Sequence, residues 1–213
     1  MMRCRVLLGD DHTVVLEGLR RILDRPGFEV VGAVKDGRAL VEAATKLHPD
    51  VTIADISMPL LNGVEAARQI RKRERRAKII FLTMHPETAY AVEAMRAGAS
   101  GYVLKDSAGD ELVTAIREVM HGRVYVTPTL KEPITRALQA RRKDSSGATG
   151  LLTPRQREVL QLMAEGRTPK EIATVLNVSK RTVEFHKYRI MEILGLRTVA
   201  ELAGYAVKQG IVT

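Results

Sequence analysis

Five short apolar runs alternate with longer segments of helical period over the first 122 residues, and this alternation restricts the possible folds more than any other feature. The apolar runs cover residues 4–9, 28–34, 51–54, 79–83 and 101–104. The helical segments cover residues 13–25, 38–47, 63–76, 87–97 and 110–121. Strands that alternate with helices form a parallel sheet covered on both faces. We therefore predict an α/β, doubly wound, five-stranded parallel sheet of order 2-1-3-4-5, with its ligand crevice at the carboxyl ends of strands 1 and 3.

From residue 151 onwards, polar capping signals mark the beginnings of helices. Threonine stands three residues before glutamine or glutamate at Thr153, Thr168 and Thr198, which is the pattern of a capping box. Ser179 marks a further helix start. We predict an all-α unit of four helices over residues 154–165, 169–176, 179–194 and 198–209. The second and third of these helices form a helix-turn-helix, whose second member enters the major groove of DNA.

The segment between these two units loses its periodicity and ends in charged and then small polar residues. This composition is typical of a flexible linker, with a short helix possible at 133–141. We therefore divide the chain into a first domain at 1–122, a linker at 123–150 and a second domain at 151–213.

Charge and composition narrow the class of protein. The net charge is +9, of which the first domain carries +1, the linker +4 and the second domain +4, so a polyanionic partner is expected for the C-terminal part. Cys4 is the single cysteine, which excludes an internal disulfide or a cysteine zinc site. The sequence has no run of 18 apolar residues and no secretory signal pattern, so we expect a cytoplasmic protein with no membrane partner.

Carboxylates and a lysine follow the strands of the first domain. Asp10 and Asp11 come directly after strand 1, and Asp55 closes strand 3. Three like charges at one crevice repel one another, so a cation is needed there, and carboxylate ligands suit Mg²⁺. Lys105 ends strand 5 and Thr83 ends strand 4, at the same edge of the sheet. An aspartate nucleophile, a metal, an ammonium group and a hydroxyl together can take up a phosphoryl group as an acyl phosphate.

These residues stand in four short motifs: Asp10-Asp11, Asp55-Ile56-Ser57-Met58-Pro59, Leu82-Thr83 and Tyr102-Val103-Leu104-Lys105. Over residues 3–122 the chain resembles the receiver domain of two-component response regulators, which has the flavodoxin-like strand order. By this resemblance Asp55 is the phosphoacceptor. Asp10, Asp11 and Asp55 hold Mg²⁺ together with the backbone carbonyl of Ser57. Thr83 and Lys105 contact the phosphoryl oxygens, and Tyr102 is an aromatic switch residue that moves with Thr83.

The predicted recognition helix has two distinct faces. At 100° per residue its core side carries Val183, His186, Ile190, Ile193 and Leu194. Glu184, Phe185 and Tyr188 lie on the outward side, where a carboxylate can accept from cytosine N4 and an aromatic edge can touch a thymine methyl. We predict these three as base contacts. The predicted phosphate contacts are Lys180, Arg181, Thr182, Lys187 and Arg189.

The second domain resembles the LuxR-type output domain through the run 152–160, Lys170-Glu171-Ile172-Ala173, Ser179, Thr182-Val183-Glu184 and His186. With the receiver this makes the chain similar to the NarL/FixJ class of response regulators. The resemblance implies a sensor histidine kinase as phosphoryl donor, a homodimer on double-stranded promoter DNA and a transcriptional regulator rather than an enzyme. Lysines stand at the positions of Glu184 and Tyr188 in several relatives, so the resemblance does not supply the operator sequence.

Other interpretations of the same residues compete with these. Asp10 or Asp11 alone reads as a helix cap, Lys105 alone as a surface lysine, and Tyr102 as a plain sheet residue. An aspartyl phosphatase is one alternative function, but no second acid stands two residues after Asp55. A DNA-binding protein with an unused receiver is another, although Asp10, Asp11 and Lys105 are all present. The helical domain alone also fits a protein-interaction bundle, and the scattered histidines have no metal-ligand spacing.

Overall fold

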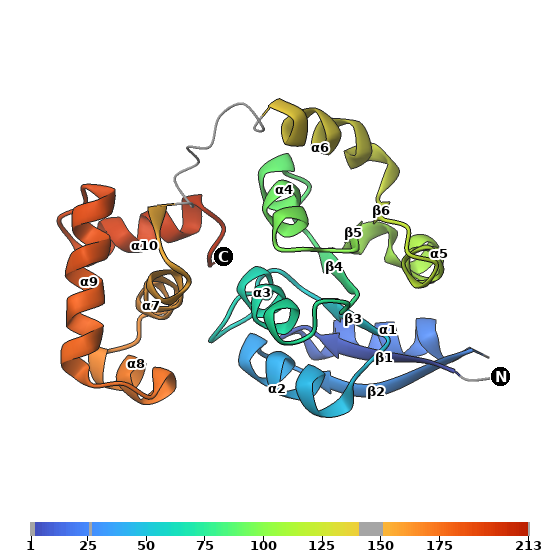
Figure 1. Ribbon diagram of the computed structural model, residues 1–213, viewed down its shortest axis with the longest axis horizontal. Coiled ribbons are helices and arrows are strands. Elements are labelled where there is room, and N and C mark those ends of the chain that lie inside the picture. The colour runs from blue at the N-terminus through green and yellow to red at the C-terminus, as the bar shows by residue number, and fades with distance from the viewer. Residues whose placement is uncertain (1–2, 26, 141–150, 213) are drawn as a thin grey trace.

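The computed structural model describes residues 3–25, 27–140 and 151–212. They form a sheet unit (residues 3–140) and a helical unit (residues 151–212) (Figure 1). The strands are β1 Cys4–Gly9, β2 Phe28–Val34, β3 Val51–Ala54, β4 Ile79–Thr83, β5 Gly101–Leu104 and β6 Tyr125–Val126. The helices of the sheet unit are α1 Thr13–Leu23, α2 Gly37–Leu47, α3 Gly63–Arg73, α4 Thr88–Arg96, α5 Ala108–Met120 and α6 Pro128–Ala140, with a 3-10 turn at Lys105–Ser107.

The strands form one parallel sheet of order β2-β1-β3-β4-β5-β6. The doubly wound parallel sheet and the order of its first five strands are confirmed. The number of strands is corrected from five to six, because Tyr125 and Val126 add a short parallel strand beside β5. The two residues of β6 are too few to show an apolar period, so the sequence pattern does not predict this strand.

Two cores fill the two faces of the sheet. On one face, apolar residues of α2, α3 and α4 pack with Leu7, Phe81 and Tyr102, and Leu130 and Ile134 of α6 join them. On the other face, α1 and α5 pack against Val6, Leu8 and their neighbours. Because both faces are covered, the central strands are almost continuously apolar, and functional groups are left to the strand ends.

The segment expected to be a linker contains regular structure over part of its length. Residues 125–126 form β6, and α6 begins at Pro128, where the sequence analysis allowed only a shorter helix at 133–141. Pro133 lies inside α6, which explains why the helix was expected to begin there. The flexible linker was predicted from the composition of residues 141–150, and these lie outside the described residues.

The helical unit contains α7 Pro154–Ala164, α8 Pro169–Leu176, α9 Lys180–Leu194 and α10 Val199–Lys208. All three capping boxes form, and the Ser179 hydroxyl accepts a hydrogen bond from the backbone N–H of Thr182. Asn177 takes a left-handed conformation in the turn between α8 and α9. One apolar core, which includes Leu160, Ile172 and Ile190, holds the four helices together. Within the described residues, no helix is both long enough and apolar enough to cross a bilayer.

Candidate functional site

The carboxylates of the first domain converge because their strands are neighbours. β1 and β3 pair in parallel with Gly9 opposite Ala54, so the residues that follow each strand emerge side by side. The backbone N–H of Asp55 donates to the carbonyl of Gly9 at 2.8 Å and fixes this register. Asp10 is 1% exposed and Asp55 4% exposed, so both carboxylates are largely removed from water.

Lys105 lies between these two buried carboxylates. Its Nζ atom is 2.8 Å from Asp10 Oδ2 and 2.9 Å from Asp55 Oδ2. Lys105 follows β5, which is separated from β3 in the sheet by β4. Three groups from distant parts of the sequence therefore meet at the carboxyl end of the sheet, on the same side.

The charges of this cluster are only partly balanced. Burial raises the pKa of Asp55, and the hydrogen bond from Lys105 works against this by favouring the carboxylate. Burial acts to lower the pKa of Lys105, but its hydrogen bonds to Asp10 and Asp55 outweigh burial and raise that pKa. One ammonium group therefore faces two carboxylates, with Asp11 nearby. The negative groups outnumber the positive one, so a further cation would offset the remaining charge.

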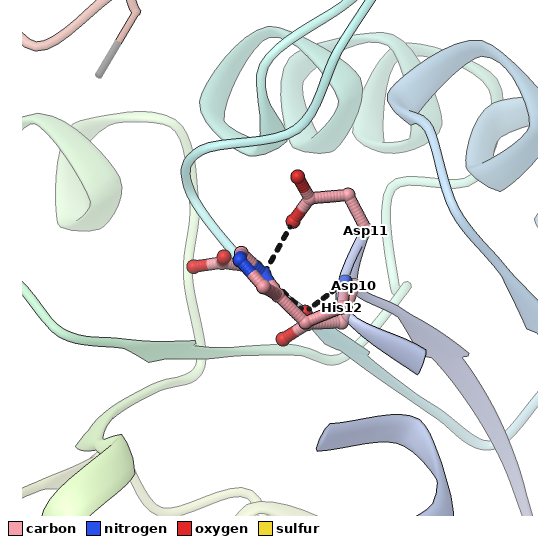
Figure 2. A group of neighbouring side chains, drawn as sticks. Asp10, Asp11 and His12 are labelled. Atoms are coloured by element: carbon pink, nitrogen blue, oxygen red, sulfur yellow. Dashed lines mark hydrogen bonds and ion pairs between the residues drawn. The ribbon is translucent and has the colours of Figure 1, made fainter. Parts of the chain in front are cut away.

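Asp11 and His12 complete the cluster at its rim (Figure 2). One ligand atom from each of Asp10, Asp11, His12 and Asp55 lies within 4.8 Å of all the others. The His12 ring Nδ1 is 2.8 Å from Asp11 Oδ1, and the His12 backbone N–H donates to Asp10 Oδ1 at 2.9 Å. The oxygen-rich set suits a hard divalent ion such as Mg²⁺. No histidine was expected at a metal site, and His12 lies here because it directly follows the two aspartates.

The expected switch residues Thr83 and Tyr102 meet at the backbone of His85. Thr83 is fully buried at the end of β4, and its hydroxyl accepts from the His85 N–H at 3.2 Å. The Tyr102 hydroxyl donates to the His85 carbonyl at 2.8 Å. The ring of His85 stacks on Tyr90, and its Nε2 lies 3.0 Å from the Ser57 hydroxyl. His85 thus links the loop after β4 to the loop after β3, a role that the sequence analysis missed.

Tyr102 is fully buried, and burial raises the pKa of its hydroxyl. Its side chain packs in the core between the sheet and α4. A residue that is both buried in this core and hydrogen-bonded to the loop after β4 can transmit a shift of that loop to the packing beneath α4.

The faces of α9 follow the helical wheel. Val183 and Ile190 are buried in the core of the helical unit. Phe185 is 60% exposed and Tyr188 64% exposed, with the Lys187 Nζ 5.4 Å from the centre of the Tyr188 ring. Glu184 is half-buried beside Lys187, and the Thr182 hydroxyl hydrogen-bonds to Ser179. The other cationic residues expected on phosphates are exposed: Lys180, Arg181 and Arg189.

A parallel sheet with paired acids and a lysine at its carboxyl end, joined to a helix-turn-helix with exposed aromatic residues, defines the class of two-component response regulators. The chain belongs to this family, in the group with a LuxR-type output domain. Residues 6–117 match the response regulator receiver domain, and residues 150–206 match the bacterial regulatory proteins of the luxR family. The family consists of transcriptional regulators rather than enzymes, so the phosphatase alternative is set aside.

Relatives of known name and structure extend over nearly the whole chain. The transcriptional regulatory protein MctR of Rhizobium johnstonii is 35% identical over 99% of this chain and 96% of its own length. The response regulator UvrY of Escherichia coli is 35% identical over 97% of this chain and 94% of its own. A structure of the response regulator RcsB of Salmonella typhimurium is 30% identical, with a TM-score of 0.66 over 98% of this chain and 99% of that one. An RcsB–DNA complex has a TM-score of 0.59 and 30% identity, over 97% of this chain and 98% of that one.

Proposed function

We propose that Asp55 accepts a phosphoryl group from a sensor histidine kinase. A carboxylate oxygen of Asp55 attacks the phosphorus, the P–N bond of the donor phosphohistidine breaks, and an acyl phosphate forms while the histidine leaves. Asp10, Asp11, Asp55 and the backbone carbonyl of Ser57 would hold Mg²⁺, which when bound neutralises charge on the transferring phosphoryl group. Thr83 and Lys105 would contact the phosphoryl oxygens. The observation that carries this proposal is the position of Lys105 against both Asp10 and Asp55.

The phosphoryl group on Asp55 would control dimerisation and promoter binding by the helical unit. A single DNA-binding unit of this size makes few contacts, so a homodimer on two half-sites is expected, with α10 as the family's candidate dimer contact. A phosphoryl group must favour the active packing by ~5.5 kcal/mol to move a 1:99 population to 99:1. We assign receiver function to 1–122, the connection to 123–150 and DNA binding to 151–213, and we expect these events to occur in the cytoplasm.

The experiment that tests this function compares DNA affinity and self-association with and without an acyl-phosphate mimic. Beryllofluoride with Mg²⁺ is such a mimic. We expect beryllofluoride to strengthen DNA binding and self-association, each by a factor within the usual range of allosteric coupling, about 5-fold to 150-fold. Identical values with and without the mimic would remove the link between the receiver and DNA binding.

We assign base contacts to Glu184, Phe185 and Tyr188, and phosphate contacts to Lys180, Arg181, Thr182, Lys187 and Arg189. Phe185 and Tyr188 are exposed three residues apart on one face of the helix, and a face that meets base edges accounts for this pair. Ser179, as the N-cap, also leaves backbone N–H groups of the first turn of α9 directed outward, where they can contact a phosphate.

Substitutions at two adjacent positions of α9 separate these assignments. Tyr188→Ala is expected to change sequence preference, since a lost base contact costs about 1–3 kcal/mol at one position only. Lys187→Ala is expected to weaken all sequences alike and to reduce the slope of log affinity against log salt by about 1. Selection of bound fragments from random DNA, together with salt titrations, measures both effects. Equal effects of the two substitutions would contradict the assignment.

A further inference from the structure

The loop that follows Asp55 is hydrogen-bonded through its backbone to the helical unit. We call residues 56–62 the acceptor loop. The side-chain amide of Gln161, on α7, donates from Nε2 to the carbonyl of Met58 at 3.0 Å and accepts at Oε1 from the N–H of Asn62 at 2.8 Å. Gln161 is 1% exposed. One buried amide of the helical unit therefore spans the acceptor loop and satisfies a backbone group near each end.

Leu60, between these two points, has a backbone conformation that leucine rarely adopts. Its φ is +65°, in the left-handed region. Its N–H donates to Oε1 of Glu165, the C-cap residue of α7, at 3.0 Å, and its side chain packs against the core of the helical unit. A strained residue persists only where its surroundings hold it. The sheet unit holds the neighbouring Pro59 carbonyl, and the helical unit holds the N–H and the side chain of Leu60 itself.

Ion pairs flank these hydrogen bonds. Arg157 of α7 donates to Oε1 of Glu65 on α3 at 2.5 Å, and the Glu65 side chain is 5% exposed. Glu158 accepts from Arg38 at 3.0 Å and from Gln69 at 3.1 Å. Breaking a buried pair of this kind leaves an uncompensated charge, so the contact between the units is specific in its geometry.

The acceptor loop is also tied directly to the phosphoacceptor position. It begins at the residue after Asp55, and the Ile56 N–H donates to Asp55 Oδ1 at 2.7 Å. Ser57 contacts the ring of His85, whose backbone N–H is bound by the Thr83 hydroxyl. The start of the acceptor loop is therefore held by the Ile56 N–H on Asp55 and by the Ser57 hydroxyl on His85, and a phosphoryl group on Asp55 would compete for these contacts.

We propose that Gln161 and Glu165 clamp the acceptor loop in the unphosphorylated chain, so that docking of α7 and a phosphoryl group on Asp55 oppose each other. The proposal rests on the proposed function and specifies how its receiver and output unit communicate. In the docked arrangement α9 lies on the side of α7 away from the sheet (Figure 1). The clamp therefore leaves the recognition helix uncovered. It fixes the position of the helical unit relative to the sheet unit, and two copies of the chain must adjust this position to bind paired half-sites.

Linkage gives the clamp a measurable consequence at the receiver. If docking and the phosphoryl group oppose each other, a substitution that weakens docking strengthens binding of the mimic, by a factor that approaches the loss in docking when the wild-type chain is almost wholly docked. Gln161→Leu removes both hydrogen bonds to the loop at similar side-chain volume. The loss of one net hydrogen bond, at the upper end of its usual range, changes an equilibrium constant about tenfold. We therefore expect full-length Gln161→Leu to bind beryllofluoride with Mg²⁺ about tenfold tighter than wild type.

The matched control is Gln139→Leu, which makes the same chemical change on the exposed face of α6. Calorimetric titration with beryllofluoride gives the affinity, and hydrogen exchange of residues 58–62 without any mimic reports directly on the clamp. Gln161→Leu is expected to speed this exchange, and Gln139→Leu to leave both readouts at wild-type values. Glu165→Leu removes the acceptor for the Leu60 N–H at a less buried position, and it serves as a second route should Gln161→Leu fold poorly.

The outcomes separate this inference from the function on which it rests. Wild-type beryllofluoride affinity and wild-type exchange in folded Gln161→Leu or Glu165→Leu protein would overturn the clamp, even if DNA binding responds to the mimic. Conversely, tighter beryllofluoride binding and faster exchange in these variants, with a DNA affinity that never responds to the mimic, would establish the clamp and overturn the proposed function.

Discussion

Asp55→Asn is expected to abolish the response of DNA binding to phosphoryl donors and to beryllofluoride. Asparagine has nearly the same shape but no anionic oxygen, so it can neither attack phosphorus nor hold the mimic. The ratio of DNA affinities with and without donor is expected to fall from its wild-type value to one. Operator or random-fragment binding, measured with the full-length variant, checks this.

The substitution is expected to leave the fold intact. The Asp55 carboxylate is desolvated, with its pKa raised by burial, so replacing it with a neutral amide removes an unfavourable buried charge. Asp24→Asn is the matched control, because Asp24 is exposed and follows α1 at the opposite end of the strands. Asp24→Asn should keep the full wild-type response. An undiminished response in Asp55→Asn would contradict the assignment of the phosphoacceptor.

Gly63→Ala is expected to destabilise the sheet unit and to displace Asp55. Gly63 is the first residue of α3, and a Cβ atom added to it would lie 2.0 Å from the carbonyl oxygen of Asp55 and 3.1 Å from the Cα of Ile56. These are backbone atoms of the strand end, which cannot rotate away as a side chain can. We expect a loss of about 3 kcal/mol in the free energy of unfolding, at the upper end for overpacked sites, and weaker beryllofluoride binding in the fraction that folds.

Gly18→Ala provides the control for this substitution. Gly18 lies within α1, and a Cβ atom there would meet nothing within 4 Å. Because glycine is about 1 kcal/mol less favourable than alanine inside a helix, Gly18→Ala is expected to leave stability unchanged or raise it slightly. Chemical denaturation of both variants measures the difference. Comparable stabilities for Gly63→Ala and Gly18→Ala would show that α3 can move away from β3 at no cost.

The helices, the strands and the cluster of Asp10, Asp55 and Lys105 follow from local signals in the sequence. Each central strand is a short apolar run closed by a polar or charged residue, and the three threonine capping boxes fix the starts of α7, α8 and α10. Once the sheet is parallel, residues that follow neighbouring strands must meet at one edge, which brings Asp10, Asp55 and Lys105 together without further information.

The parts that sequence reasoning missed depend on contacts between distant segments. Tyr125 and Val126 become a strand only because the edge of β5 is available to pair with them. Gln161 is a polar residue on an amphipathic helix and would be read as solvated, yet it is 1% exposed because the acceptor loop of the other unit covers it. His85 likewise carries no motif, and its role comes from stacking on Tyr90 and from its bonds to Ser57 and Tyr102.

The most direct test of the central claim is to locate the modified residue after treating the full-length protein with a small acyl-phosphate donor. Reduction of the acyl phosphate with borohydride marks the aspartate that carried it, and peptide mass spectrometry then identifies the residue. Our account predicts a Mg²⁺-dependent mark on Asp55, lost in Asp55→Asn and strongly reduced when Lys105 is replaced by alanine. A mark on another residue, or none on Asp55 in the presence of Mg²⁺, would contradict it.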